Sequence, residues 1–245
     1  KAMAPDADWQ AHRRLAARQR REGRDHVSHR KSGRILSSRV LFTAGLDHAA
    51  VRTLPPGASD LARATACRDG TMIAALALMP LRRRSFLGLT LGTSLIATGT
   101  GMSIVLEPGD TKTGMAWESP VPASLAAPLR RYIAEARPYL LSRGGHHGDV
   151  LWLNDHGAAY GPEHFSDRIR RLTQKLVGTR VSPHLFRDCA ATTLACEGPE
   201  AARLSRAILG HRGFATATRH YNHAKALESG RDFAGLIDAL REGSR

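Results

Sequence analysis

Apolar residues recur every three or four positions over most of the chain, which is the spacing of one face of an α-helix. This pattern predicts helix over residues 64–91, where Pro80 and three arginines interrupt it, and over residues 125–136. A further amphipathic helix is predicted from the apolar positions Phe165, Ile169, Leu172 and Leu176. We therefore expect a mainly α-helical domain that begins near Ile35.

The pattern changes after residue 93, where short β-prone runs alternate with turn residues. Residues 94–98, 102–106 and 115–119 predict three strands, because glycine- and proline-containing stretches separate them. The segment 108–114, which forms the second of these turns, contains Lys112. We predict an α+β fold class, mainly α-helical, with a small antiparallel three-stranded sheet.

The composition is strongly basic, with 36 Lys and Arg against 22 Asp and Glu, and the net charge is +14. Half of this excess lies in residues 1–40, which hold eleven basic and four acidic residues. Such a charge suits a polyanionic partner. Residues 1–34 show little apolar periodicity, and we interpret them as a basic linker or the remnant of an N-terminal DNA-binding region. The domain proper is then residues 35–245.

Other sequence features narrow the class of protein. No apolar run reaches the roughly 18 residues of a membrane span, so no membrane partner is expected. The charged start at Lys1 has no signal-peptide pattern and suggests a fragment of a longer chain. Cys67, Cys189 and Cys196 show no metal-ligand spacing, so we expect buried, reduced thiols in a cytoplasmic protein.

Two groups suited to binding a phosphate lie one helical turn apart in the segment Ser182-Pro-His-Leu-Phe-Arg187. Ser182 is a favourable N-cap residue, and Pro183 suits the first helical position. A helix that begins there places His184 and Arg187 on one face.

A histidine and a tyrosine follow downstream, in Leu209-Gly-His211 and Arg219-His-Tyr221. Gly210 predicts a helix end, which puts His211 at the start of a loop. A tyrosine hydroxyl, with a pKa of about 10, needs neighbours that take its proton and stabilise the developing charge on its target. Arginine and histidine without carboxylates indicate a target that is already anionic, such as a phosphodiester.

In this order, the residues resemble the catalytic domain of the tyrosine recombinases, the phage-type integrase family, over roughly residues 35–245. The family pattern starts with an arginine at the end of an early helix and a lysine in a hairpin. The full set in this chain is Arg82, Lys112, His184, Arg187, His211 and Tyr221. The resemblance implies a site-specific recombinase or integrase that cuts and rejoins DNA through a 3′-phosphotyrosyl intermediate, without metal or other cofactor.

The resemblance also implies a role for each residue type. Arg82 and Arg187 would clamp the non-bridging phosphate oxygens, because the planar guanidinium fork is always charged. Lys112 would be the general acid for the 5′-hydroxyl leaving group. Tyr221 would attack, and His211 would donate to a non-bridging oxygen. The role of His184 stays open: it either accepts the tyrosine proton or holds the phosphate.

The resemblance further implies double-stranded DNA as partner and a homotetramer on two DNA sites, compatible with a monomer in free solution. A prokaryotic, nucleoid-associated protein is expected. The apolar pattern from Phe233 to Leu240 predicts a C-terminal helix that docks on a neighbouring copy or packs on its own domain.

Several positions have competing interpretations. Arg83 and Arg84 compete with Arg82, and the Leu-Gly-Leu that follows favours Arg82. A metal site is not expected, because the downstream histidines lack a known ligand spacing and have no acid or cysteine among them. The other three tyrosines lie in less basic or amphipathic contexts and are predicted to be packing residues, namely Tyr132, Tyr139 and Tyr160.

The sequence departs from the family pattern in three ways. Ser85 stands where many members carry an acid, and the interval from His211 to Tyr221 is one residue longer than the commonest spacing. The forty basic residues at the start cannot supply the N-terminal helical domain that integrases usually carry, so we expect either a chain cut from something longer or an incomplete copy. Two rival functions follow: a type IB topoisomerase, which uses the same side chains, and a DNA-binding remnant that no longer cuts. The DNA sequence recognised is not encoded in these motifs.

Overall fold

A computed structural model describes the protein at residues 33–99, 101–112, 114–144, 148–198, 200–201 and 208. Contacts divide the chain into two units, Lys1–Gly33 and Arg34–Arg245.

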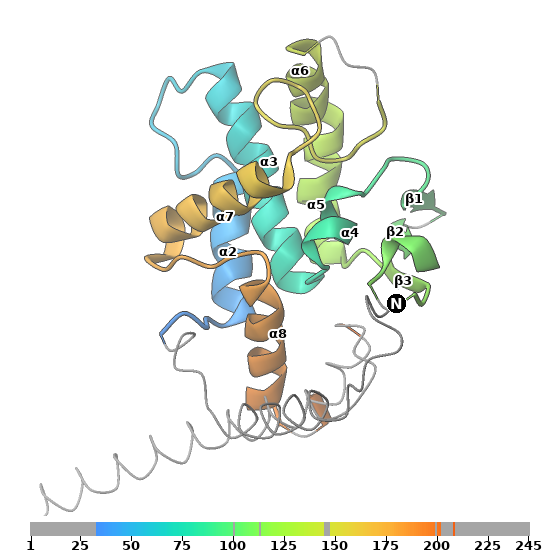
Figure 1. Cartoon of the computed structure of the whole chain (residues 1–245). Helices are drawn as coiled ribbons and strands as arrows, with labels where there is room; N and C mark the ends of the chain where they lie inside the picture. Colours follow the sequence, from blue (N-terminus) through green and yellow to red (C-terminus); the bar gives the residue numbers. More distant parts are fainter. Residues whose placement is uncertain are drawn as a thin grey trace, which may run out of the picture. The chain divides into compact units, whose positions relative to one another are not determined.

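The fold is mainly helical with one small sheet, which confirms the predicted class (Figure 1). The helices are α2 (Ser38–Ala49), α3 (Asp60–Leu78), α4 (Arg83–Leu87), α5 (Ala123–Arg131), α6 (Arg137–Ser142), α7 (Pro162–Val177) and α8 (Leu185–Cys196). The strands are β1 (Leu95–Thr98), β2 (Gly101–Leu106) and β3 (Trp117–Pro120). A 3-10 turn, η2 (Pro108–Asp110), and a π-helical turn, η3 (Tyr132–Ala136), complete the set.

Helix α3 lies at the centre, in contact with α2, α5, α6, α7 and α8 (Figure 1). Every residue from Ala64 to Ala77 is buried, as expected for a helix rich in small and apolar residues on all sides. Helix α2 crosses it closely: a Cβ added at Gly70 would lie 2.1 Å from the backbone nitrogen of Ala49. Glycine therefore sets the separation of these two helices.

The predicted helix over 64–91 is wrong in its second half. Helix α3 ends at Leu78, next to Pro80, and only the short α4 follows. Beyond α4 the chain is extended: the nitrogen of Leu91 donates to the carbonyl of Asp149 at 2.7 Å, and that of Leu151 donates to Leu89 at 2.8 Å. Apolar runs of this length fit a buried extended segment as well as a helix, so periodicity alone misassigned them.

The predicted helix over 125–136 is longer than expected. Helix α5 begins at Ala123 and continues through the π turn η3 into α6. Pro138 at the start of α6 has no N–H to donate, and the wider turn lies directly before it.

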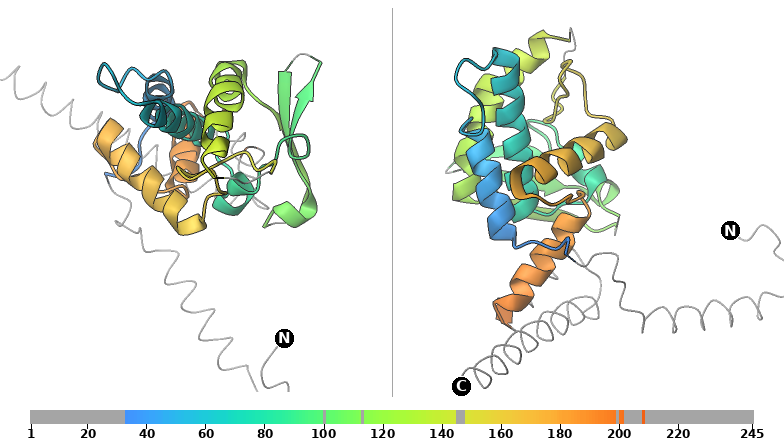
Figure 2. Two further views of the ribbon diagram at one scale, coloured as in Figure 1. Left: turned by 90° about the horizontal axis from the view of Figure 1, so that it is seen from above. Right: turned by 90° about the vertical axis from the view of Figure 1, so that its left-hand side faces the viewer.

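The sheet has the predicted three antiparallel strands in the order β1-β2-β3, with Leu95 opposite Ile104 and Ser103 opposite Pro120. It stands at one edge of the helical body (Figure 2). The last strand begins at Trp117, two residues later than predicted. The reason is local: the hydroxyl of Thr111 bonds both backbone groups of Met115, which keeps that residue in the turn.

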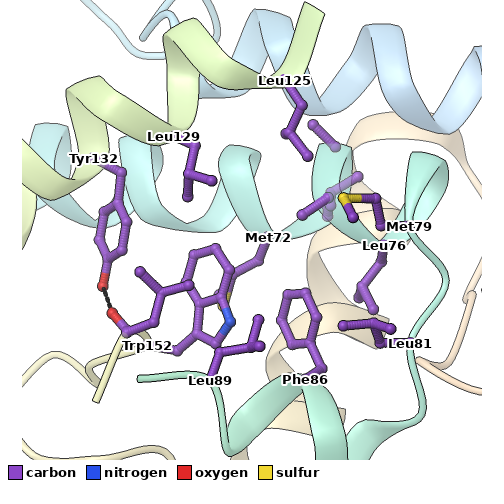
Figure 3. Close-up of a cluster of buried hydrophobic side chains, with 14 of the residues drawn as sticks. Met72, Leu76, Met79, Leu81, Phe86, Leu89, Leu125, Leu129, Tyr132 and Trp152 are labelled. Carbon is purple, nitrogen blue, oxygen red and sulfur yellow. Dashed lines mark hydrogen bonds between the residues drawn. The ribbon is translucent and has the colours of Figure 1, made fainter. Parts of the chain in front are cut away.

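An aromatic stack forms the core beneath α4 (Figure 3). Phe86 of α4 stacks on Trp152 at 4.9 Å and on Phe165 of α7 at 5.5 Å between ring centroids. Tyr132 stacks on the other side of Trp152 and donates its hydroxyl to the carbonyl of Leu151 at 2.7 Å. Burial raises the pKa of Tyr132 to about 12. Tyr132 lies in the core, and Tyr139 and Tyr160 are half-buried and pack against it, which confirms all three as packing residues.

A buried charge network joins α3 to α7. Arg68 and Asp69 are both fully buried and form an ion pair of 2.7 Å. Asp69 also pairs with Arg168 of α7 at 2.6 Å, and Arg68 pairs with Asp155 at 2.8 Å. The Arg68 guanidinium lies over the Tyr160 ring, 5.1 Å from its centroid. Because each buried charge has a partner, the network fixes α7 against the central helix.

The cysteine prediction is confirmed at two positions and wrong at one. Cys67 and Cys189 are buried free thiols, whereas Cys196, the last residue of α8, is exposed. Within the ranges that the structure describes, no helix is both long and apolar enough to cross a membrane.

Candidate active site

Arg82 is placed by the break between two helices. It is the N-cap residue of α4, with extended backbone angles, and its side chain is half-buried. Its neighbours hold the backbone on both sides: Leu81 is buried in the core, and Phe86 lies in the aromatic stack (Figure 3). In the described part of the chain, no acceptor pairs with the Arg82 guanidinium.

Arg187 reaches the same region from α8. Its side chain is only 7% exposed, and its Nη1 donates to the carbonyl oxygen of Pro80 at 2.6 Å. Burial and the positive charge of Arg82 lower the pKa of Arg187 to about 10, against the opposing effect of Asp188. The group remains a cation at neutral pH. Two guanidinium groups from distant parts of the sequence thus lie close enough to repel each other, an arrangement that an anion between them would relieve.

His184 lies beside Arg187, but the predicted helix start is wrong. Helix α8 begins at Leu185 with His184 as N-cap, not at Pro183 with Ser182 as N-cap. The carbonyl of Ser182 accepts from the nitrogen of Leu185 at 2.8 Å, so these residues form a turn before the helix. His184 already has helical backbone angles and an exposed side chain, one turn from the buried Arg187.

The loop before His184 is fixed by backbone contacts. Gly178 ends α7 with a φ of 71°, a conformation that favours glycine. The buried Thr173 of α7 then holds the chain, because its hydroxyl accepts from the nitrogen of Val181 at 2.9 Å. The Arg34 side chain, which lies far from this loop in sequence, donates to the carbonyl of Arg180 at 3.1 Å. These bonds determine where α8 begins.

Lys112 lies exposed in the connection between β2 and β3. Asp110 lies two residues before Lys112. Its carbonyl oxygen accepts a hydrogen bond of 2.7 Å from the hydroxyl of Ser85 in α4. Ser85 is three residues after Arg82, so this hydrogen bond ties the Lys112 loop to the helix that follows Arg82. No sequence pattern indicates this contact, because its partners are 25 residues apart.

The other two arginines of the triplet have different environments. Arg83 forms an ion pair of 2.9 Å with Glu163 and donates to the hydroxyl of Ser166 at 3.1 Å, which attaches α4 to α7. Arg84 is exposed. Of the three arginines, Arg82 is the one whose charge acts on Arg187 and lowers its pKa. The three arginines are adjacent in sequence but have different surroundings in the structure.

The structure brings Arg82, Arg187 and His184 into one region, with the Lys112 loop attached to it. His211 and Tyr221 lie outside the described residues, as do His220, His223 and the predicted helix from Phe233 to Leu240. Their roles remain predictions. In the ranges that are described, no three His, Cys, Asp or Glu residues gather in a way that would hold a metal ion.

Comparison with known proteins gives the family. The model of the phage integrase family matches residues 46–228. The chain therefore belongs to the phage integrase family.

Individual relatives agree with this assignment. Tyrosine recombinase XerD of Pseudomonas aeruginosa is 32% identical over 157 residues, which cover 64% of this chain and 49% of XerD. Tyrosine recombinase XerC of Anoxybacillus flavithermus is 34% identical over 96 residues, covering 39% of this chain and 31% of XerC. The matched region thus spans half or less of these relatives.

A solved structure shows the same fold. The XerH site-specific recombinase, bound to palindromic difH substrate in a post-cleavage complex, aligns with a TM-score of 0.60 and 16% identity. The alignment covers 84% of this chain and 55% of XerH.

Proposed function

We propose that this chain is the catalytic part of a site-specific DNA recombinase that cuts and rejoins strands through Tyr221. The observation that carries the proposal is the approach of two arginines from separate elements. Arg187 is buried against the carbonyl of Pro80, and its pKa is lowered in part by Arg82. Two converging guanidinium groups suit the non-bridging oxygens of one phosphodiester.

The proposed cleavage step balances without a cofactor. The Tyr221 oxygen forms a bond to phosphorus as the bond to the 5′ oxygen breaks, and the phenolic proton passes to a base, for which His184 is the candidate. Lys112 donates a proton to the departing 5′ oxygen. Arg82, Arg187 and His211 stabilise the charge on the phosphorane-like transition state.

Rejoining reverses these steps, because a 5′-hydroxyl attacks the 3′-phosphotyrosyl bond and releases the phenol. The protein–DNA bond preserves the free energy of the broken phosphodiester, so no external energy source enters the balance.

The proposed partner is double-stranded DNA, since the net charge is +14 and the structurally similar XerH is bound to DNA substrate. We propose that residues 1–34 are a basic linker or the remnant of an N-terminal DNA-binding region and that residues 35–245 are the catalytic domain. For complete strand exchange we propose four copies on two DNA sites.

A nicked suicide substrate tests the catalytic role of Tyr221. The nick makes the released strand a short oligonucleotide with a 5′-hydroxyl, which diffuses away. Without this hydroxyl the strand cannot be rejoined, so the phosphotyrosyl adduct accumulates. We expect a covalent adduct with the unchanged chain and none with Tyr221→Phe. The control is Tyr139→Phe, which removes the hydroxyl of a half-buried packing residue and should leave adduct formation unchanged.

The same assay separates the rival functions. Salt-sensitive DNA binding without any adduct would support a non-catalytic remnant and contradict the proposal. Relaxation of supercoiled plasmid that lacks any specific site would support a topoisomerase, which the family relatives do not favour.

A further inference from the structure

Ser85 makes a contact that the proposed chemistry does not yet use. Its side chain is only 7% exposed, and its Oγ donates to the carbonyl oxygen of Asp110 at 2.7 Å. One partner lies in α4, three residues after Arg82, and the other lies two residues before Lys112. The hydrogen bond therefore connects the helix next to a phosphate-binding candidate with the loop of the general-acid candidate.

The loop that carries Lys112 is internally bonded. The nitrogen of Glu107 donates to the Asp110 carboxylate at 3.3 Å, around the 3-10 turn η2. The hydroxyl of Thr111 donates to the carbonyl of Met115 at 2.8 Å and accepts from its nitrogen at 3.1 Å. Because these bonds close the loop on both sides of Lys112, a tether at Asp110 limits the movement of the whole turn.

Helix α4 provides a fixed end for this tether. Phe86, the residue after Ser85, stacks on Trp152 and Phe165, and Arg83 is paired with Glu163 of α7. The packing of α4 on the core therefore fixes the position of the Ser85 hydroxyl. The hydrogen bond from this hydroxyl to Asp110 in turn fixes the position of the loop.

We propose that Ser85 is a positioning residue that holds the Lys112 ammonium where it protonates the departing 5′ oxygen. This inference rests on the proposed function. A lysine ammonium on a four-carbon stem loses much freedom when it is aligned, so anchoring its backbone reduces the cost of reaching the reactive geometry. The contact requires a donor: a hydroxyl can donate to the Asp110 carbonyl, whereas an ionised carboxylate at position 85 only accepts.

A substrate that needs no general acid tests this role. In one substrate the bridging 5′ oxygen is replaced by sulfur, so that a thiolate leaves with the electron pair of the broken P–S bond. Thiols ionise near pH ~8.5 and water near ~15.7, so the thiolate departs without a proton donor. Single-turnover adduct formation is measured on this and the ordinary substrate.

The expected pattern is selective. Ser85→Ala should slow cleavage of the ordinary substrate by about tenfold or more, a part of the ~100- to 10,000-fold that a general acid contributes. It should leave cleavage of the sulfur substrate within about threefold of the unchanged chain, and Lys112→Ala should show the same selectivity with a larger loss. Ser85→Asp should resemble Ser85→Ala, whereas Ser85→Thr, which keeps a hydroxyl donor, should restore most of the rate. Ser142→Ala, at an exposed helix end, serves as the matched serine control.

Hydrogen exchange gives a second measurement that is independent of catalysis. In Ser85→Ala, amides of residues 107–116 should exchange faster, while those of α3 and α7 keep their protection. Ser85→Cys, a nearly isosteric change to a weaker donor, replaces Ser85→Ala in both measurements if the alanine variant does not fold.

Other outcomes overturn the inference. Equal slowing on both substrates would make Ser85 a general structural residue, and an unchanged rate on the ordinary substrate would show that the tether is dispensable. Absence of any adduct with the unchanged chain on both substrates would instead overturn the proposed function, and this inference with it.

Discussion

At the residue scale, three consecutive arginines show how environment assigns different tasks to one residue type. Arg83 is used to attach α4 to α7 through Glu163, and Arg84 is exposed. Arg82 lies half-buried near Arg187 and lowers its pKa. Placing two guanidinium groups close together costs free energy. Such like-charge pairs cluster at functional sites, where a bound anion offsets the repulsion.

Substitution of these arginines tests the assignment. Arg82→Ala should reduce single-turnover cleavage by about 100- to 1,000-fold, or roughly 3 kcal/mol of transition-state stabilisation, the typical cost of losing one preorganised oxyanion donor. Arg83→Ala removes an exposed ion pair, which typically contributes about 0–1 kcal/mol to stability, and should change the cleavage rate little. Equal loss of activity in the two variants would contradict the choice of Arg82.

At the element scale, the crossing of α2 and α3 depends on glycine. A Cβ at Gly70 would lie 2.1 Å from the nitrogen of Ala49 and 2.4 Å from the carbonyl of Gly45. Alanine is a better helix former than glycine by about 1 kcal/mol, but these contacts involve backbone atoms, which cannot rotate away.

Gly70→Ala should therefore lower the free energy of unfolding by about 1–3 kcal/mol, the usual cost of overpacking a core. Gly109→Ala is the control, since its added Cβ meets nothing within 4 Å and its φ is not in the left-handed region. Urea unfolding of both variants provides the measurement. A stable Gly70→Ala protein would show that the two helices can separate without loss.

Helices and strands could be predicted from the sequence where the hydrophobic pattern fitted one kind of secondary structure. Helix α7 follows its apolar face, with Phe165, Ile169 and Leu172 buried, and the sheet follows its turns. The extended segment around Leu89 was not predictable, because its partners at residues 149–151 lie far along the chain. The start of α8 was also missed, since residues 182–185 form a backbone turn before the helix, in which the nitrogen of Leu185 donates to both the carbonyl and the hydroxyl of Ser182.

At the scale of the whole molecule, the proposed recombination requires contacts between copies. The sequence predicts a C-terminal amphipathic helix from Phe233 to Leu240, which lies outside the described residues. If this helix docks on a neighbouring copy, it links the four copies on two DNA sites.

Deletion of residues 230–245 should therefore weaken synapsis of two DNA sites and spare cleavage at a single site, because the catalytic candidates all lie before residue 230. Native gel electrophoresis of the protein with two labelled sites measures synapsis, and the suicide substrate measures cleavage. Unchanged assembly would indicate that the segment packs on its own domain.

The sequence by itself determined the kinds of chemical group and their order: two arginines, a lysine, histidines and a tyrosine on a basic, mainly helical chain. This information is local, since spacing along the chain fixes helices, turns and motifs. Only the tertiary structure decided that Arg82, not Arg83, lies by Arg187, and that Ser85 bonds the loop of Lys112. The Ser85–Asp110 hydrogen bond joins residues 25 positions apart, and the Arg187–Pro80 hydrogen bond beside Arg82 joins residues 107 positions apart, so spacing along the chain does not encode either contact.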